Sequence, residues 1–194
     1  MNEIEKVLSL FETAEDWNSF VELSNMKDMM VRELKCRLLT EMRKIAVPKL
    51  SGADWEYDAN CDYISIVLHG HHTLKLGIEW KFWTCPWYER GAGIWINPSE
   101  INPEKFIGKV NANADLKGFL TDKGFHESRE NAWYPFMKTI PAEVFFSNDS
   151  CRLVEECLFR AIQDAEGLAK DLWNNVFNPF VEGNVISMLV EALQ

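Results

Sequence analysis

A run of strict alternation over residues 73–82 constrains the fold of this chain more than any other feature. Apolar residues occupy every second position from Leu74 to Phe82, and polar residues or glycine occupy the positions between them. Successive side chains of a strand point to opposite faces, whereas a helix would need apolar residues at spacings of three and four. We therefore predict a strand with one buried face and one charged face.

Two strand-like runs flank this alternating run. Residues 62–68 are rich in β-branched side chains and are joined to it by a short segment that contains glycine, which predicts a hairpin. Residues 93–97 form another run and end at Pro98, which cannot continue an internal ladder. A short strand is also expected within 54–57. These runs predict an antiparallel sheet of three to five strands over about 54–97.

Patterns typical of amphipathic helices precede and follow the predicted sheet. A helix is expected over residues 2–11. Thr13 and Asp16 have the spacing of a capping box, which predicts a second, short helix, and a third helix is expected from about residue 25 to about Ala46, ended by Pro48. The apolar residues of 149–176 recur at helical spacing and predict a long C-terminal helix. Shorter helices are expected over 103–110, 115–123 and 185–193, and an exposed loop is expected over 124–132.

The length and composition of the chain favour one domain. A chain of 194 residues of which 47% are hydrophobic has enough apolar surface for a sizeable core. We divide it into a helical N-terminal part, residues 1–48, and an α+β core, residues 52–194. The predicted fold class is α+β, with the antiparallel sheet flanked by N-terminal helices and by the long C-terminal helix.

Cysteine usage and hydropathy bear on the cellular compartment. The five cysteines are scattered and never form a Cys-x-x-Cys pair, which is typical of reduced thiols in a cytoplasm rather than of disulfides or a zinc ribbon. No apolar run approaches the ~20 residues of a membrane span. The acidic N-terminus lacks the features of a signal peptide. We expect a cytoplasmic protein with no membrane association.

The formal net charge of −10 bears on the kind of partner. Proteins that bind nucleic acids usually carry a basic stripe, because most of their affinity comes from phosphate contacts. The charge therefore disfavours a nucleic-acid partner without excluding a locally basic cleft. It suits a protein partner that carries basic patches.

Three residues of the predicted hairpin are candidates for catalysis. Asp62 begins one strand, and Glu79 and Lys81 share a face of the next strand because they are two positions apart. This arrangement resembles the motif of the PD-(D/E)xK nucleases. The resemblance implies that Asp62 and Glu79 would hold Mg²⁺ and that Lys81 would position or activate the attacking water. The alternative is an ordinary solvated strand whose charged face has no catalytic role.

A second resemblance covers more of the chain, about residues 52–176. The LGIEW run, the Gly-rich GAGIWIN run, the WYPF aromatic patch and the long helix are similar to the C-terminal region of some bacterial PD-(D/E)xK-superfamily proteins. That region follows the nuclease core and is not catalytic, so this resemblance implies an accessory or recognition module. The residues that carry it are Gly77, Ile78, Trp80, Trp95, Trp133, Tyr134 and Pro135.

Aromatic residues outside the predicted strands are candidates for binding. Trp83, Trp87 and Tyr88 follow the alternating run, and Trp133 and Tyr134 lie further along the chain. Trp and Tyr outside regular structure serve as interface anchors or as stacking surfaces for bases and sugars. The alternative is that these rings fold back over an edge of the sheet.

We therefore predict a non-catalytic cytoplasmic interaction or recognition module, of the kind found in prokaryotic or phage defence systems, with a protein partner and no cofactor. The alternative is a nuclease that uses Asp62, Glu79 and Lys81 and takes Mg²⁺ as its cofactor. The two hypotheses differ in geometry, because the nuclease requires the carboxylates of Asp62 and Glu79 to converge beside Lys81.

Overall fold

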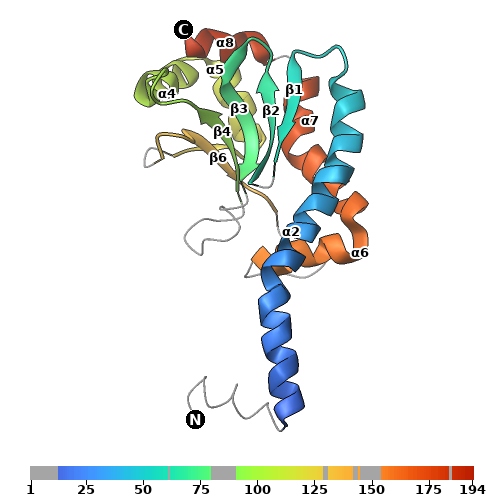
Figure 1. Ribbon diagram of the computed structural model, residues 1–194. Helices are drawn as coiled ribbons and strands as arrows, with labels where there is room; N and C mark the ends of the chain where they lie inside the picture. Colours follow the sequence, from blue (N-terminus) through green and yellow to red (C-terminus); the bar gives the residue numbers. More distant parts are fainter. Residues whose placement is uncertain are drawn as a thin grey trace.

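The computed structural model describes residues 13–60, 62–79, 91–128, 131–141, 144, 154–183 and 185–194, without the side chains of 154–159. A six-stranded antiparallel sheet, in the order β1-β2-β3-β4-β6-β5, lies against a layer of helices (Figure 1). The α+β class is therefore confirmed, and the sheet has one strand more than the largest predicted number. The strands are β1 (Trp55–Ala59), β2 (Tyr63–Leu68), β3 (His71–Glu79), β4 (Gly91–Ile96), β5 (His126–Glu127) and β6 (Phe136–Thr139).

The alternating run forms β3, which is the second strand of the predicted hairpin. Leu74, Leu76 and Ile78 are buried, whereas Lys75 and Glu79 on the other face are half-buried. The hairpin with β2 turns at Gly70, whose φ of 76° lies in the left-handed region that glycine tolerates. The predicted strand pattern is confirmed through residue 79, and residues 80–82 lie outside the described residues.

Strands β5 and β6 are the part of the sheet that the prediction omitted. Strand β6 pairs with β4, so that Met137 lies opposite Gly93, and β5 pairs with the other edge of β6. The predicted exposed loop over 124–132 is therefore wrong at His126 and Glu127. Strand β5 has two residues and β6 has four, which is too few for alternation to be recognised in the sequence. They are strands because they pair with other segments of the chain.

One continuous helix, α2 (Ala14–Leu50), replaces the second and third helices predicted for the N-terminal part, and the helix predicted over 2–11 lies outside the described residues. The capping box at its start is confirmed, since the backbone N–H of Asp16 donates to Thr13 Oγ1 and the backbone N–H of Thr13 donates to Asp16 Oδ2. The predicted cap near residue 25 is wrong. The helix is continuous there, so its backbone hydrogen bonds leave no N–H group for a cap to satisfy. Pro48 lies inside the last turn, two residues before the end of the helix.

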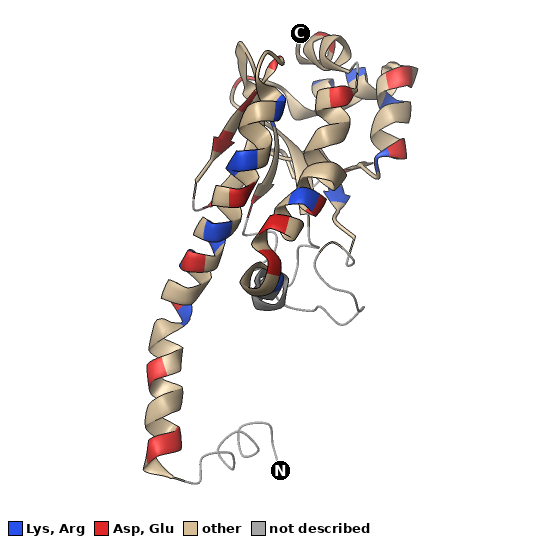
Figure 2. Cartoon of the chain, turned by 90° about the vertical axis from the view of Figure 1, so that its right-hand side faces the viewer, with Lys and Arg blue, Asp and Glu red and all other residues tan. Residues whose placement is uncertain are grey.

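The N-terminal half of α2 projects away from the body of the molecule (Figure 1). Among the described residues of this helix, burial begins at Leu38 and recurs every four residues, which is the face that packs against the body. Acidic and basic side chains alternate along the helix rather than forming one charged stripe (Figure 2). Five apolar side chains of the projecting half are between 46% and 62% exposed, namely Trp17, Leu23, Met26, Met29 and Met30.

The remaining helices lie behind the sheet in Figure 1 or extend beside α2. The predicted long helix over 149–176 is interrupted, because Asp164 leaves helical geometry at φ −153° and ψ 73° and its carboxylate accepts the backbone N–H of Gly167. The chain then passes through a π-helical segment, which no apolar periodicity foretells. The helices are α4 (Pro103–Ala112), α5 (Ala114–Asp122), α6 (Val154–Leu172), the π-helix η2 (Trp173–Phe177), α7 (Asn178–Glu182) and α8 (Ile186–Leu193).

The core lies between the sheet and the helices. The rings of Trp55 and Phe180 meet edge to face at 6.5 Å, and Phe180 also contacts Phe119 and Phe125 edge to face. Among the described residues, no helix covers the opposite face of the sheet, which we call the open face (Figure 1). None of the helices in the described part of the chain is both long and apolar enough to cross a bilayer.

Candidate binding site

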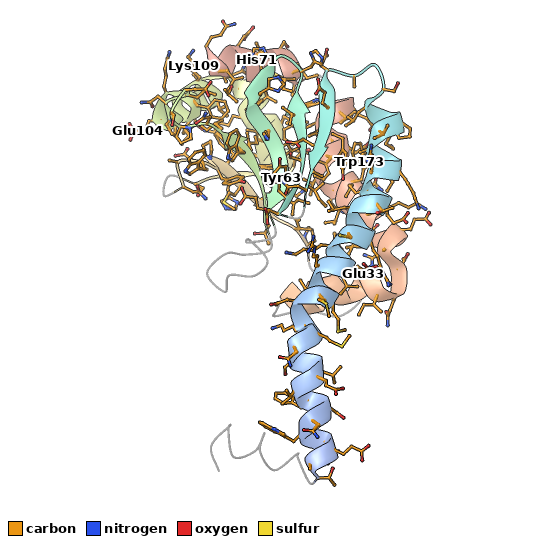
Figure 3. All side chains as sticks on the ribbon, in the orientation of Figure 1. Glu33, Tyr63, His71, Glu104, Lys109 and Trp173 are labelled. Carbon is orange, nitrogen blue, oxygen red and sulfur yellow. The ribbon has the colours of Figure 1, made fainter. Side chains whose placement is uncertain are left out.

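The open face carries a row of polar and small residues across four strands. Asp58, Ser65, Gly77 and Gly93 are direct cross-strand partners, so their side chains or Cα hydrogens lie side by side on this face. Glu79 lies opposite Tyr63 on one side of this row, and Lys75 lies opposite Trp95 on the other side. The fold therefore brings polar and aromatic groups from distant parts of the sequence to one surface. Tyr63 is labelled in Figure 3, toward the lower end of the sheet.

A pocket of about 160 Å³ lies in this surface, and we call it the open-face pocket. Its floor includes Gly77, and its walls are the rings of Tyr63, Trp95 and Tyr134. A Cβ atom on Gly93 would lie 2.5 Å from Cδ1 of Tyr134, so the Tyr134 ring rests directly on the Gly93 backbone. Because Gly77 has no side chain, the floor of the pocket lies at the level of the β3 backbone. The lining residues are Tyr63, Ser65, Lys75, Gly77, Ile78, Glu79, Trp95 and Tyr134.

One end of the pocket holds the ammonium group of Lys75. Its Nζ lies 2.8 Å from Asp58 Oδ2, which also accepts the hydroxyl of Tyr63 at 3.0 Å. The same Nζ lies 5.2 Å from the centroid of the Tyr63 ring and 5.6 Å from the Trp95 ring. Both distances fall within the range of cation–π attraction. The aromatic walls therefore already hold one cation of the protein itself.

Burial and hydrogen bonding fix the protonation of Tyr63. Burial raises the pKa of its phenol, and the hydrogen bond to the Asp58 carboxylate raises this pKa further. The phenol therefore stays neutral near pH 7 and keeps its proton for Asp58. Ser65 is 2% exposed, and its hydroxyl donates to the backbone carbonyl of Asp58 at 2.9 Å, which satisfies this buried group.

The other end of the pocket holds the carboxylate of Glu79. The hydroxyl of Tyr134 donates to its Oε1. A carboxylate has two oxygens with about four lone-pair sites, so it can accept hydrogen bonds from more than one donor. Because Glu79 and Lys75 are four positions apart on one strand, their Cα atoms lie roughly 13 Å apart along β3.

An Asx turn places the two aromatic residues that precede β6. The side chain of Asn131 accepts the backbone N–H groups of Trp133 and Tyr134, at 3.1 and 3.2 Å. Tyr134 points inward and is 3% exposed, whereas Trp133 is 47% exposed and stacks on Trp95 with a centroid distance of 5.7 Å. One of the two predicted binding residues is therefore a wall of the pocket, and the other supports a wall from outside.

The predicted catalytic residues are only partly described. Asp62 is exposed, and its backbone N–H donates to Asn60 Oδ1. It directly precedes Tyr63, the partner of Glu79, so a regular strand would send the Asp62 and Glu79 carboxylates to opposite faces. Within the described ranges, no group of three or more His, Cys, Asp or Glu side chains is arranged to hold a metal ion. Lys81 lies outside the described residues, and so do the predicted binding residues Trp83, Trp87 and Tyr88.

Several lining residues were missed by the sequence analysis. Tyr63 lies opposite Glu79, and the register of the predicted hairpin would have identified it as a neighbour. Lys75 was placed on the charged face of β3 without a partner, because its partner Asp58 belongs to β1. The register of β1 against β2 depends on the whole buried face, and the sequence of a five-residue strand does not specify it.

Comparison of the chain with protein-family models, with curated proteins and with solved structures gives no match. The geometry of the described residues is therefore the basis for any functional conclusion.

Proposed function

We propose that this protein is a non-catalytic recognition module that binds a protein partner by taking a lysine or arginine side chain of that partner into the open-face pocket. The observation that carries the proposal is the position of Glu79, whose carboxylate ends a pocket walled by Tyr63, Trp95 and Tyr134. A carboxylate beside aromatic rings is the usual chemistry for holding an organic cation.

The size and the electrostatics of the pocket support a basic side chain. A volume of about 160 Å³ suits one long side chain rather than a nucleotide or a folded element. The rings of Tyr63 and Trp95 already attract the ammonium of Lys75, so these walls are suited to a cation. Glu79 would supply the counter-charge for a guest, as Asp58 supplies it for Lys75.

The surface of the protein supports a protein partner. The net charge of −10 favours approach by a basic surface. The exposed apolar residues Leu23, Met26, Met29 and Met30 on the projecting half of α2 are of the kind that adapts to a protein surface, since methionine is flexible and polarizable. The proposal includes a cytoplasmic location and a role in a prokaryotic or phage defence-type system, where the resemblance to a non-catalytic accessory region would place it.

The rival proposal is a Mg²⁺-dependent nuclease that uses Asp62, Glu79 and Lys81. In the recognition module Glu79 accepts a hydrogen bond from Tyr134 and pairs with a guest cation, whereas in the nuclease it would share a metal ion with Asp62. The two proposals therefore assign incompatible partners to one carboxylate, and a single substitution of Glu79 tests both.

The experiment uses the full chain and acetylated, amidated peptides of the form Gly-Gly-X-Gly-Gly, titrated by two-dimensional amide NMR. We expect binding when X is arginine or lysine and no binding when X is glutamine or leucine. Glu79→Gln should weaken binding at least tenfold, since hydrogen bonds to charged groups contribute about 1.5–3 kcal/mol. The matched control Glu191→Gln, at an exposed position of α8, should leave the affinity unchanged. Equal binding of the glutamine and arginine peptides would refute the proposal.

A further inference from the structure

A second and larger hollow lies between β1 and the C-terminal half of α2, and we call it the β1 groove. It has a volume of about 880 Å³ and follows β1 along its whole length. Strand β1 is at the end of the sheet order and pairs only with β2 among the described strands. The groove thus runs along a sheet edge, with a helix as its other wall.

The register of β1 shows which backbone groups face the groove. The N–H of His69 donates to the carbonyl of Asp54, and the N–H of Asn60 donates to the carbonyl of Tyr63. Because hydrogen-bonded pairs alternate in an antiparallel ladder, the even-numbered residues from 54 to 60 direct both groups at β2. Trp55, Tyr57 and Ala59 therefore direct three N–H and three C=O groups at the outer edge, where no other described strand pairs with them.

Exposed strand edges of this kind are templates for another strand. Natural sheets usually block them with a proline, a bulge or a very short strand, and β1 has five regular residues with neither a proline nor a bulge in its pairing with β2. The α2 side of the groove carries the apolar residues Leu39, Val47, Pro48 and Leu50, together with the polar residues Thr40 and Arg43. An added strand would find main-chain partners on one side and apolar contacts on the other.

The two faces of β1 present different chemistry to an added strand. Trp55 and Tyr57 point toward the core side, where the hydroxyl of Tyr57 reaches the backbone carbonyl of Leu39 at 3.5 Å and bridges strand to helix. The indole Nε1 of Trp55, a residue that is 2% exposed and lines the groove, has no hydrogen-bond partner among the described residues. Glu56 and Asp58 point to the open face, so that side of the edge is acidic.

We propose that the β1 groove binds an extended segment of a partner protein, in which basic and apolar residues alternate, as a seventh strand on β1. Cross-strand partners share a face, so residues opposite Glu56 and Asp58 would be lysine or arginine. Residues opposite Trp55, Tyr57 and Ala59 would be apolar and would contact α2. This site is distinct from the open-face pocket, and its test does not depend on the function proposed for that pocket.

The test uses the full chain and an eight-residue peptide of alternating lysine and valine, with binding followed by fluorescence anisotropy of a dye on the peptide. Two N-methylated versions are compared, one methylated at the lysines and one at the valines. In a bound strand, either the lysines or the valines direct their N–H groups at β1, and the other residues direct theirs away. Methylation of the residues that face β1 should weaken binding at least tenfold, and methylation of the other residues should have little effect. Equal effects of the two methylation patterns would overturn the proposal, because non-specific attraction between opposite charges does not distinguish them.

Protein variants identify the site independently of the peptide chemistry. Glu56→Lys should weaken binding at least fivefold, whereas the matched control Glu191→Lys should not. Ala59→Pro removes an N–H that points outward and should also weaken binding, with a thermal melt to show that the variant folds. If the unbound chain instead forms a dimer that Ala59→Pro dissociates, the occupant of the groove is a second copy of the chain and the proposal is overturned.

Discussion

The contact between Gly93 and Tyr134 permits a quantitative test of how the open-face pocket is built. In Gly93→Ala, the new Cβ would lie 2.5 Å from Tyr134 Cδ1 and 3.3 Å from Cγ and Cε1. These atoms belong to a rigid ring that is 3% exposed, so the ring has to move rather than rotate away. Overpacking of a core typically destabilises by about 1–3 kcal/mol, and loss of the hydrogen bond from Tyr134 to the Glu79 carboxylate adds about 1.5–3 kcal/mol.

We therefore expect Gly93→Ala to lower the free energy of unfolding by about 2.5–6 kcal/mol. The assay is equilibrium unfolding in urea, monitored by circular dichroism, with the slope of the transition checked for constancy. The matched control is Gly118→Ala in α5, where an added Cβ meets no atom within 4 Å. That change should raise the stability by about 0.5–1 kcal/mol, since alanine is favoured over glycine inside a helix.

A double-mutant cycle with Tyr134→Ala isolates the contact. Tyr134→Ala alone should be destabilising, because it removes a buried ring. In that background the obstruction at Gly93 is gone, so Gly93→Ala should have an effect of less than about 0.5 kcal/mol, which is the usual error of additivity. An undiminished loss of stability in the Tyr134→Ala background would show that the glycine is required for another reason and would refute this account of the pocket.

Four further expectations can be measured separately. Burial raises the pKa of Tyr57 from 10.0 to about 12, so the unfolded chain loses the phenolic proton at a lower pH than the folded chain. The free energy of unfolding should therefore fall as the pH rises from 10 to about 12. Tyr57→Phe should reduce that fall, as measured by urea melts at a series of pH values. Asn102→Ala removes the side chain that accepts the N–H of Lys105 at the start of α4 and should destabilise by about 1 kcal/mol in the same assay, whereas Asn18→Ala, in the projecting half of α2, should not. Plasmid DNA incubated with the protein and Mg²⁺ should remain uncut, and cleavage that Lys81→Ala abolishes would establish the nuclease instead. Lys75→Met leaves Asp58 without its cation and should increase the affinity of the β1 groove for the lysine–valine peptide about threefold. The control Lys123→Met should leave this affinity unchanged. An unchanged affinity in Lys75→Met would show that Asp58 does not contribute to binding at the groove.

The parts of the fold that local patterns encode were predictable from the sequence. The alternation of Leu74, Leu76 and Ile78 specified both the strand and its buried face, and the side chains of Thr13 and Asp16 specified the start of α2. Both features depend on residues a few positions apart. Pro48 shows the limit of such rules, because a proline is a strong sign of a helix end and yet α2 continues for two residues beyond it.

The parts that depend on distant pairing were not predictable in the same way. Strand β6 has four residues, and its identity as a strand comes from β4, more than forty residues earlier in the chain. The open-face pocket combines residues of β2, β3, β4 and the turn before β6, so its composition follows from strand order rather than from any motif. The Glu-x-Lys motif identified Glu79 but suggested a metal ion as its partner. Its hydrogen-bond donor Tyr134 lies 55 residues away in the sequence, beyond the reach of a local motif.

Asp58 connects the two proposed sites. Its side chain holds Lys75 between the rings of Tyr63 and Trp95, and the same residue lines the β1 groove. A basic residue of a strand in the groove would compete with Lys75 for this carboxylate, which would loosen the ammonium group from the aromatic walls. Because the effect of one ligand on the affinity of another is reciprocal, a cation in the open-face pocket would in turn alter binding at the groove. Such coupling needs no movement of the backbone, since a single carboxylate on β1 contributes to both surfaces.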